Sequence, residues 1–196
     1  DKYFDSSVAL GYDLRVLNWR IIPSAGFAYR NRKWTAADGF LQYPVSGLWT
    51  GEEPKQELYG PVISYEQAVW FPVIALKAGY ALKERFLLWA GGSLYPLMWG
   101  DTIDNHLLRS QQFYDAMREG FGGAVNIGFH YNFGGKERIA LAASAGYETI
   151  ELKGNTAMKE TGVSDGTLLV AEGYGSRMES GRWTFALGFV RRFGGE

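Results

Sequence analysis

The sequence contains one short motif with the residue types of a catalytic site, Asp104-Asn105-His106. On an extended backbone, residues i and i+2 project from the same face, so the carboxylate would lie beside the imidazole. Such a carboxylate orients the imidazole and stabilises its protonated form, and the imidazole can then accept a proton from water or a hydroxyl. The other interpretation is a polar loop that simply contains an Asp and a His. The motif alone leaves both interpretations open.

The elements that would position this motif show a recurring period-2 pattern. In residues 125–133, large apolar side chains occupy every second position, and the positions between them hold Asn, Gly and His. Similar alternation occurs near residues 8–16, 74–82, 139–148 and 183–190. An apolar ribbon backed by a small, neutral face is typical of a transmembrane strand that faces lipid outside and a lumen inside. The pattern predicts an all-β, antiparallel, up-and-down transmembrane barrel.

Composition supports this class and excludes several others. Aromatic residues make up 16% of the 196 residues and there are 26 glycines, which suits aromatic girdles, small lumen positions and turns. A net charge of −1 argues against nucleic-acid binding, and the absence of cysteine excludes disulfides and thiolate metal sites. The mean hydropathy of −0.18 argues against a helical membrane protein. No zinc signature, phosphate loop or serine nucleophile motif appears, so we expect no metal and no nucleic-acid partner.

The chain divides into about seven predicted strands in a single domain over residues 1–196. They lie near 4–17, 19–35, 61–82, 86–100, 119–133, 138–153 and 177–193. Tight turns at 17–19, 83–85 and 134–137 alternate with long connections at 36–60, 101–118 and 154–176, which we expect on the extracellular side. Pro72 and Pro96 predict bends or bulges. Because bacterial barrels have even strand numbers, seven strands predict a domain that is incomplete at its N-terminus.

At this point the sequence resembles the omptin family of outer-membrane endopeptidases. The similar segments are short but occur in order along the chain. They are Ala25-Gly26-Phe27 with Lys33-Trp34-Thr35-Ala36, Ile63 to Gln67, Pro72 to Leu76 with Gly79-Tyr80, Trp99 with Asp104-Asn105-His106, Asn126 to Phe129, and Lys153 to Thr156. The resemblance implies a ten-stranded barrel in the outer membrane with its active site facing outside. It also implies an aspartic-type endopeptidase that acts on peptide or protein substrates, contacts outer-membrane lipid and is a monomer.

The resemblance further implies that Asp104 and His106 form a catalytic dyad, with no cofactor. In omptins an Asp-x-Asp pair faces the dyad, and by this resemblance it falls at or before residue 1. Asp1 and Asp5 are nearby acids, but their spacing differs from that pair. The family's acidic specificity residue, two positions before the catalytic Asp, corresponds to Thr102 here, so Asp101 is the candidate substrate-binding residue. Lipopolysaccharide dependence stays open, because the matching positions hold Phe27, Tyr29, Asn31 and Ala68.

Other candidates have simpler explanations. His130 faces the predicted lumen and fits a satisfied interior histidine, and Arg30 and Arg32 fit a solvated face. Glu148, Glu151 and Lys153 lie near a predicted rim, where charges are usually solvated. The rival function is a non-enzymatic small barrel, an adhesin or a structural protein, which would require a complete chain closing with eight strands. A soluble β-sandwich is a third possibility, disfavoured by the outward aromatic ribbons.

The predicted incompleteness has a direct test in the intact mass of the native protein extracted from membranes. We expect a mass clearly above the 21.9 kDa of this chain. A native mass equal to that value would favour the non-enzymatic barrel.

Overall fold

A computed structural model gives the structure of the chain. It describes residues 1–196 except 45–46, 48–50, 52, 83–84, 134–138, 161–167, 170–174 and 192–196. The predicted tight turn at 134–137 and two residues of the one at 83–85 lie outside the described residues. In the part that the structure describes, no helix has the length and apolar character needed to cross a bilayer.

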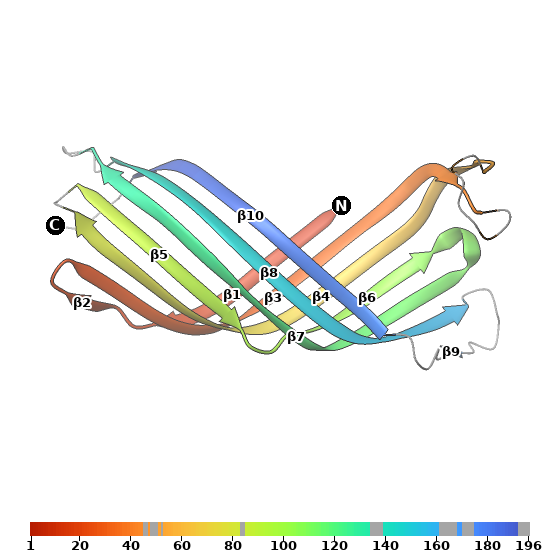
Figure 1. The fold of residues 1–196 in the computed structure, drawn as a ribbon, viewed down its shortest axis with the longest axis horizontal. Helices are drawn as coiled ribbons and strands as arrows, with labels where there is room; N and C mark the ends of the chain where they lie inside the picture. The colour runs from red at the N-terminus through yellow and green to blue at the C-terminus, as the bar shows by residue number, and fades with distance from the viewer. Residues whose placement is uncertain are drawn as a thin grey trace.

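Seven long strands form one continuous antiparallel sheet, which is rolled into the wall of a barrel (Figure 1). The path is β1-β3-β4-β5-β7-β8-β10, with each strand hydrogen-bonded to its neighbours in the chain. The bounds are β1 Lys2–Gly11, β3 Trp19–Leu41, β4 Gln56–Leu82, β5 Phe86–Tyr95, β7 Gln111–Asn132, β8 Ile139–Glu160 and β10 Gly175–Arg191. Three short strands complete the sheet: β2 (Leu14–Val16), β6 (Trp99–His106) and β9 (Leu168–Leu169). The predicted all-β barrel fold with about seven strands is confirmed.

The outer face of the sheet carries the predicted apolar ribbons. Large apolar side chains are widely exposed there, for example Ile127 at 63% and Leu187 at 77%. Aromatic pairs flank this band, with Tyr29–Trp70 and Phe27–Trp99 near one end and Trp19–Tyr80 near the other. Exposed apolar side chains between two aromatic girdles form the surface that a bilayer requires.

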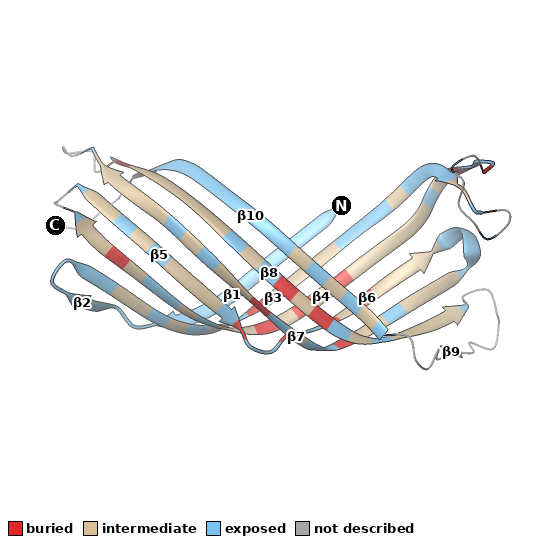
Figure 2. Cartoon of the chain, in the orientation of Figure 1, coloured by how far each residue is buried: buried red, intermediate tan, exposed pale blue. Residues whose placement is uncertain are grey.

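The inner face holds a small apolar core. Its most buried members are Phe71, Met98, Met117 and Leu152, each 2% exposed or less. Tyr95 and Ile150 belong to the same cluster. Figure 2 shows most of the buried stretches of the chain near the middle of the sheet. The described lumen is therefore filled at this level by side chains.

The described parts of the predicted long connections are largely strand, which corrects the sequence interpretation. Strand β3 continues to Leu41 and β4 begins at Gln56. Within 101–118, β6 runs to His106, the 3₁₀ helix η1 spans Leu107–Arg109, and β7 begins at Gln111. Polar residues occur on both faces of these segments, so the segments lack the apolar ribbon that identified the other strands.

A waist divides the membrane part of the sheet from this extension. Residues 96–98 interrupt the ladder between β5 and β6, and Met98 N–H donates to the carbonyl of Gly120 at 3.0 Å. Strand β7 has a bulge at Arg118, between Met117 and Glu119. The bend predicted at Pro96 is therefore confirmed. The bulge predicted at Pro72 is wrong, because β3 and β4 stay in register there. Pro72 instead lies opposite residues 96–98, the interruption between β5 and β6. On one side of Pro72, β4 pairs with β6, and on the other side it pairs with β5.

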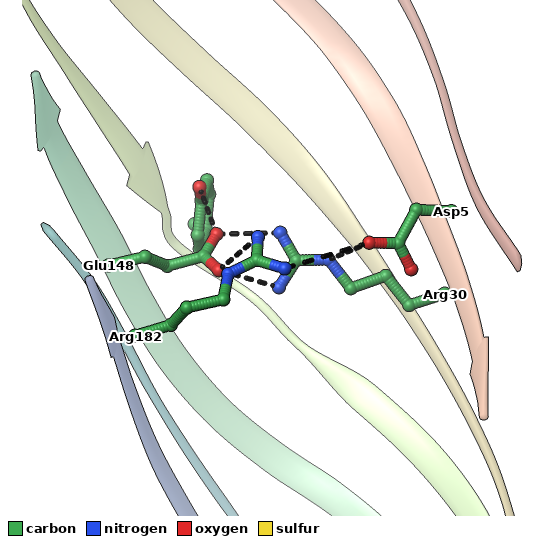
Figure 3. A network of polar contacts seen from close by, with 5 residues as sticks. Asp5, Arg30, Glu148 and Arg182 are labelled. Carbon is green, nitrogen blue, oxygen red and sulfur yellow. Dashed lines mark hydrogen bonds and ion pairs between the residues drawn. The ribbon is translucent and has the colours of Figure 1, made fainter. Parts of the chain in front are cut away.

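An ion network crosses the lumen at the waist (Figure 3). Arg30 on β3 donates two hydrogen bonds to Glu148 on β8, at 2.9 and 2.6 Å, although these strands are not neighbours in the sheet. Tyr95 and Arg182 also donate to Glu148, at 2.7 and 3.1 Å. The solvated roles predicted for Arg30 and Glu148 are wrong, because each side chain is 13% exposed. The network ties opposite walls of the barrel together.

Removing the charge of Glu148 should therefore destabilise the barrel. We expect Glu148→Gln to lower the free energy of unfolding by about 3 kcal/mol, because it leaves the buried Arg30 with only the longer ion pair to Asp5, at 4.0 Å, among the described residues. Urea unfolding in detergent, followed by tryptophan fluorescence, measures the change. The control is Glu66→Gln, which breaks an exposed pair with Lys33 and should cost less than about 1 kcal/mol. Equal losses in the two variants would contradict the structural role of the network.

Candidate functional site in the outer extension

The candidate site lies on β6 and β7, beyond the aromatic girdle that contains Trp70 and Trp99. The interruption at the waist determines which side chains of β6 point inward. In β5 the core residue Tyr95 points inward, and after the interruption so does Met98, three residues later. Because alternation has period 2, this odd step moves the even-numbered residues of β6 to the inner face. Asp104 and His106 consequently share that face.

The two side chains of the predicted dyad are in contact. His106 Nε2 lies 3.3 Å from Asp104 Oδ2, and the side chains are 30% and 29% exposed. An ionised carboxylate can only accept hydrogen bonds, so the neutral imidazole carries its hydrogen on Nε2. The lone pair is then on Nδ1, which is the nitrogen able to accept a proton.

One oxygen of Asp104 has no hydrogen-bond partner among the described residues. This Oδ1 is buried, and a buried carboxylate oxygen without a donor is costly. The other oxygen, Oδ2, is the one that contacts the imidazole.

The strand that carries the dyad is held from its outer face. Asn105, between the two dyad residues, projects to that face and donates to Ser64 Oγ on β4 at 3.0 Å. On the other side, Gln112 of β7 donates to Asn105 Oδ1 at 2.7 Å. These bonds fix β6 to both neighbouring strands at the level of the dyad, where the ladder ends at η1.

A second carboxylate, Asp115, holds the strands together on the inner face. It lies on β7 directly opposite Thr102 and accepts hydrogen bonds from Thr102 Oγ1 and Thr156 Oγ1, each at 2.6 Å. Thr102 is 1% exposed, so the bond is shielded from water. Asp115 thus links β6, β7 and β8 two residues below Asp104.

Two aromatic residues complete the inner surface around the dyad. Phe113 lies edge-on to the His106 ring, with centroids 5.0 Å apart, which limits how the imidazole can turn. Tyr65 of β4 is the register partner of Asp104. Burial raises the pKa of the Tyr65 hydroxyl, a hydrogen bond with Thr102 opposes this, and the charges of Asp115 and Asp104 raise it further. The hydroxyl therefore stays protonated at neutral pH.

The structure does not bring Asp101 to the dyad. Asp101 is an odd-numbered residue of β6 and lies on the outer face, where its Oδ1 accepts from Arg118 at 2.6 Å and from Tyr114 at 2.8 Å. Its role in substrate binding stays a prediction. Asp5 lies on β1 in the waist network, 4.0 Å from Arg30 and 3.9 Å from Arg182.

The remaining rim candidates also lie away from the dyad. Glu151 forms ion pairs with Lys153 at 2.9 Å and Arg177 at 3.0 Å. Glu151 pairs in register with the widely exposed Phe121, which places it on the outer face. In the part of the chain that the structure describes, no group of three or more His, Asp or Glu side chains can hold a metal ion.

Sequence reasoning missed Asp115, Thr156, Tyr65 and Phe113 as neighbours of the dyad. Three of them lie within predicted long connections or at their ends, and Tyr65 was noted only as part of a short similar segment. The signal that was available is the alternation of Gln111, Phe113, Asp115 and Met117, which share the inner face.

Comparison with known proteins agrees with this architecture. The family model described as the Omptin family matches residues 8–193, which is almost the whole chain. The chain belongs to the omptin family. Together with the barrel fold, this makes it an outer-membrane protein.

A solved structure of similar fold is the outer membrane protease OmpT from Escherichia coli. It superposes with a TM-score of 0.76 at 17% sequence identity. The match covers 95% of this omptin chain and 62% of the OmpT chain, so the chain spans about three-fifths of its solved relative. No curated protein sequence matches the chain.

The role assigned to Asp115 can be measured directly. We expect Asp115→Ala to loosen β6 by about 2 kcal/mol, because Thr102 and Thr156 lose a charged acceptor in a buried place. Hydrogen exchange of the β6 amides, from Trp99 to His106, reports this local stability. The control is Asp101→Asn, which breaks an exposed pair on the other face of the same strand. Unchanged exchange in Asp115→Ala would show that the threonine bonds do not hold the strand.

Proposed function

We propose that this omptin is an endopeptidase that hydrolyses peptide bonds with a water activated by the Asp104–His106 dyad. The observation that supports this most is the 3.3 Å contact between the two side chains on the inner face of the extension. OmpT is a protease of the same fold. Because the chain spans only part of OmpT's length, the proposal concerns the activity of the whole protein.

The chemistry follows from the arrangement of the two residues. His106 Nδ1 accepts a proton from a water while the resulting hydroxide attacks the carbonyl carbon of the scissile bond. Asp104 stabilises the imidazolium that forms, through the bond to Nε2. When the C–N bond breaks, the imidazolium returns the proton to the leaving amine. The reaction consumes one water and returns the imidazole to its neutral form.

The extension offers a preorganised place for this reaction. The dyad lies on a strand that is fixed by Asn105 on one face and by the Thr102–Asp115 bond on the other. Catalytic groups on regular strands are held more precisely than groups on loops. The apolar core at the waist closes the lumen below, so substrate would enter from the open end of the barrel.

The proposal also predicts the orientation, the substrates and the surroundings of the protein. The open end would face the cell exterior, and the substrates would be extracellular peptides or proteins. The protein would act as a monomer surrounded by outer-membrane lipid, without a metal or other cofactor. Whether lipopolysaccharide is needed is part of the same proposal to be tested, as is the contribution of Asp101 to substrate binding.

The decisive experiment compares the two histidines of the chain. We expect His106→Ala to reduce cleavage of a fluorogenic peptide library by at least about 100-fold, because the general base is lost. The barrel should stay folded, as judged by its gel mobility with and without heating. The matched control is His130→Gln, at the other end of β7, which should retain cleavage.

The variant Asp104→Asn tests the role of the carboxylate independently. The amide cannot stabilise the imidazolium as a carboxylate does, so we again expect a large loss of kcat. Unchanged cleavage in His106→Ala would refute the dyad mechanism. If the wild-type protein itself cleaves no peptide, the non-enzymatic barrel becomes the better explanation.

A further inference from the structure

Lys77 is an ionisable residue in the part of β4 whose other face is apolar. Its sequence neighbours Leu76 and Ala78 lie on the outer face, where Leu76 is 53% exposed. The Lys77 ammonium lies 4.0 Å from the centroid of the Trp89 ring. Within the described residues, no carboxylate forms an ion pair with it. Lys77 is exposed on the inner face, and an ionisable residue at membrane depth usually marks a functional position.

The surroundings of Lys77 carry an excess of positive charge. Lys77 pairs in register with Ile22, so Arg20 is the next residue of β3 on the same inner face. Arg20 is bound to Asp13 at 2.8 Å, and Arg15 is bound to the same carboxylate at 3.0 Å. Three cations thus share one described anion at this end of the lumen. The single carboxylate is already occupied and cannot neutralise Lys77.

A cavity adjoins the ammonium. Its volume is about 380 Å³, and its lining includes Lys77, Trp89, Ser24, Ser93 and Asn126. Serine hydroxyls and the asparagine amide are neutral hydrogen-bond donors. Gly91, opposite Lys77, also lines the cavity, and a Cβ at this position would lie 2.7 Å from Asn126 Oδ1. The glycine therefore leaves room for the Asn126 amide in the cavity wall.

One wall of the cavity is Trp89, whose ring the ammonium contacts. The indole Nε1 is itself buried and has no hydrogen-bond partner among the described residues, so it does not open onto the cavity. The groups that the cavity offers to a ligand are therefore the ammonium and the neutral donors of Ser24, Ser93 and Asn126. A positive charge beside several neutral donors fits a small anion with several oxygens.

We propose that this cavity binds a small oxyanion, of the size of phosphate or acetate, with Lys77 as its principal ligand. The site is separate from the candidate active site. Lys77 is twelve residues along β4 from Tyr65, which corresponds to about 40 Å of strand. The proposal therefore does not depend on the protease activity.

Binding is tested with inorganic phosphate. The purified protein in a phosphate-free, non-ionic detergent is titrated calorimetrically with sodium phosphate, at an ionic strength held constant with sodium chloride. We expect a saturable isotherm with one site per chain. Lys77→Met should weaken the affinity by at least about tenfold, because a charge-assisted contact is lost. Trp89→Phe, which keeps the ring but removes the N–H, should weaken it less.

A matched control and a rescue separate the site from general effects. Lys33→Met removes another lysine, on the outer face and paired with Glu66 at 3.1 Å, and should leave phosphate binding unchanged. Lys77→Arg keeps the charge and should retain measurable binding, which also covers the case in which Lys77→Met does not fold. Acetate should displace phosphate if the recognised chemistry is that of a small oxyanion.

The opposite results are equally clear. A titration that does not saturate, or one with the same affinity in the wild-type protein and Lys77→Met, would overturn the proposal. Phosphate binding that acetate cannot displace would remove carboxylates from the ligand class. Loss of binding in Lys33→Met as well would show that only overall charge matters, which also contradicts a built site.

Discussion

The candidate site depends on one constraint. At the waist, two neighbouring stretches of the sheet both change which of their residues, odd-numbered or even-numbered, point inward. In β5 the inward residues are odd-numbered, and after residues 96–98 the inward residues of β6 are even-numbered. In the neighbouring strand β7, the bulge at Arg118 also reverses which residues point inward. The two irregularities must occur together, because residues opposite each other in a ladder share a face. Arg118 joins them directly, since its guanidinium donates to the carbonyl of Gly100 at 3.0 Å and to Asp101 at 2.6 Å. Without the pair of shifts, Asp104 and Asp115 would both point outward.

This constraint also explains how far the sequence could be interpreted. Alternation identified the membrane parts of the strands, because there one face is apolar and the other is small. The spacing of Asp104 and His106 correctly predicted that they share a face. It did not say which face, since the bulge and the interruption each reverse the alternation, and bulges leave little trace in one sequence. Extending the pattern of residues 125–133 backward would have placed Asp115 on the wrong side. The extension itself was taken for loops because polar residues occur on both its faces.

The waist network was hidden for a different reason. Arg30 and Glu148 are 118 residues apart and lie on strands that do not pair. Each charge on its own suggests a solvated rim, and only the rolled sheet brings them together across the lumen. There the carboxylate accepts from two arginines and Tyr95, which offsets the desolvation of the charges. Together with the apolar core around Phe71 and Met117, the network separates the two ends of the lumen.

The two ends of the inner face differ in charge, with the waist network and the apolar core between them. Above the waist, Asp104 contacts the imidazole of His106, and Asp115 accepts from two threonines. Below it lie Arg15, Arg20 and Lys77, and the two arginines both pair with Asp13. The end with the dyad therefore places the candidate general base among carboxylates, while the opposite end offers cations, as the binding of an anion requires.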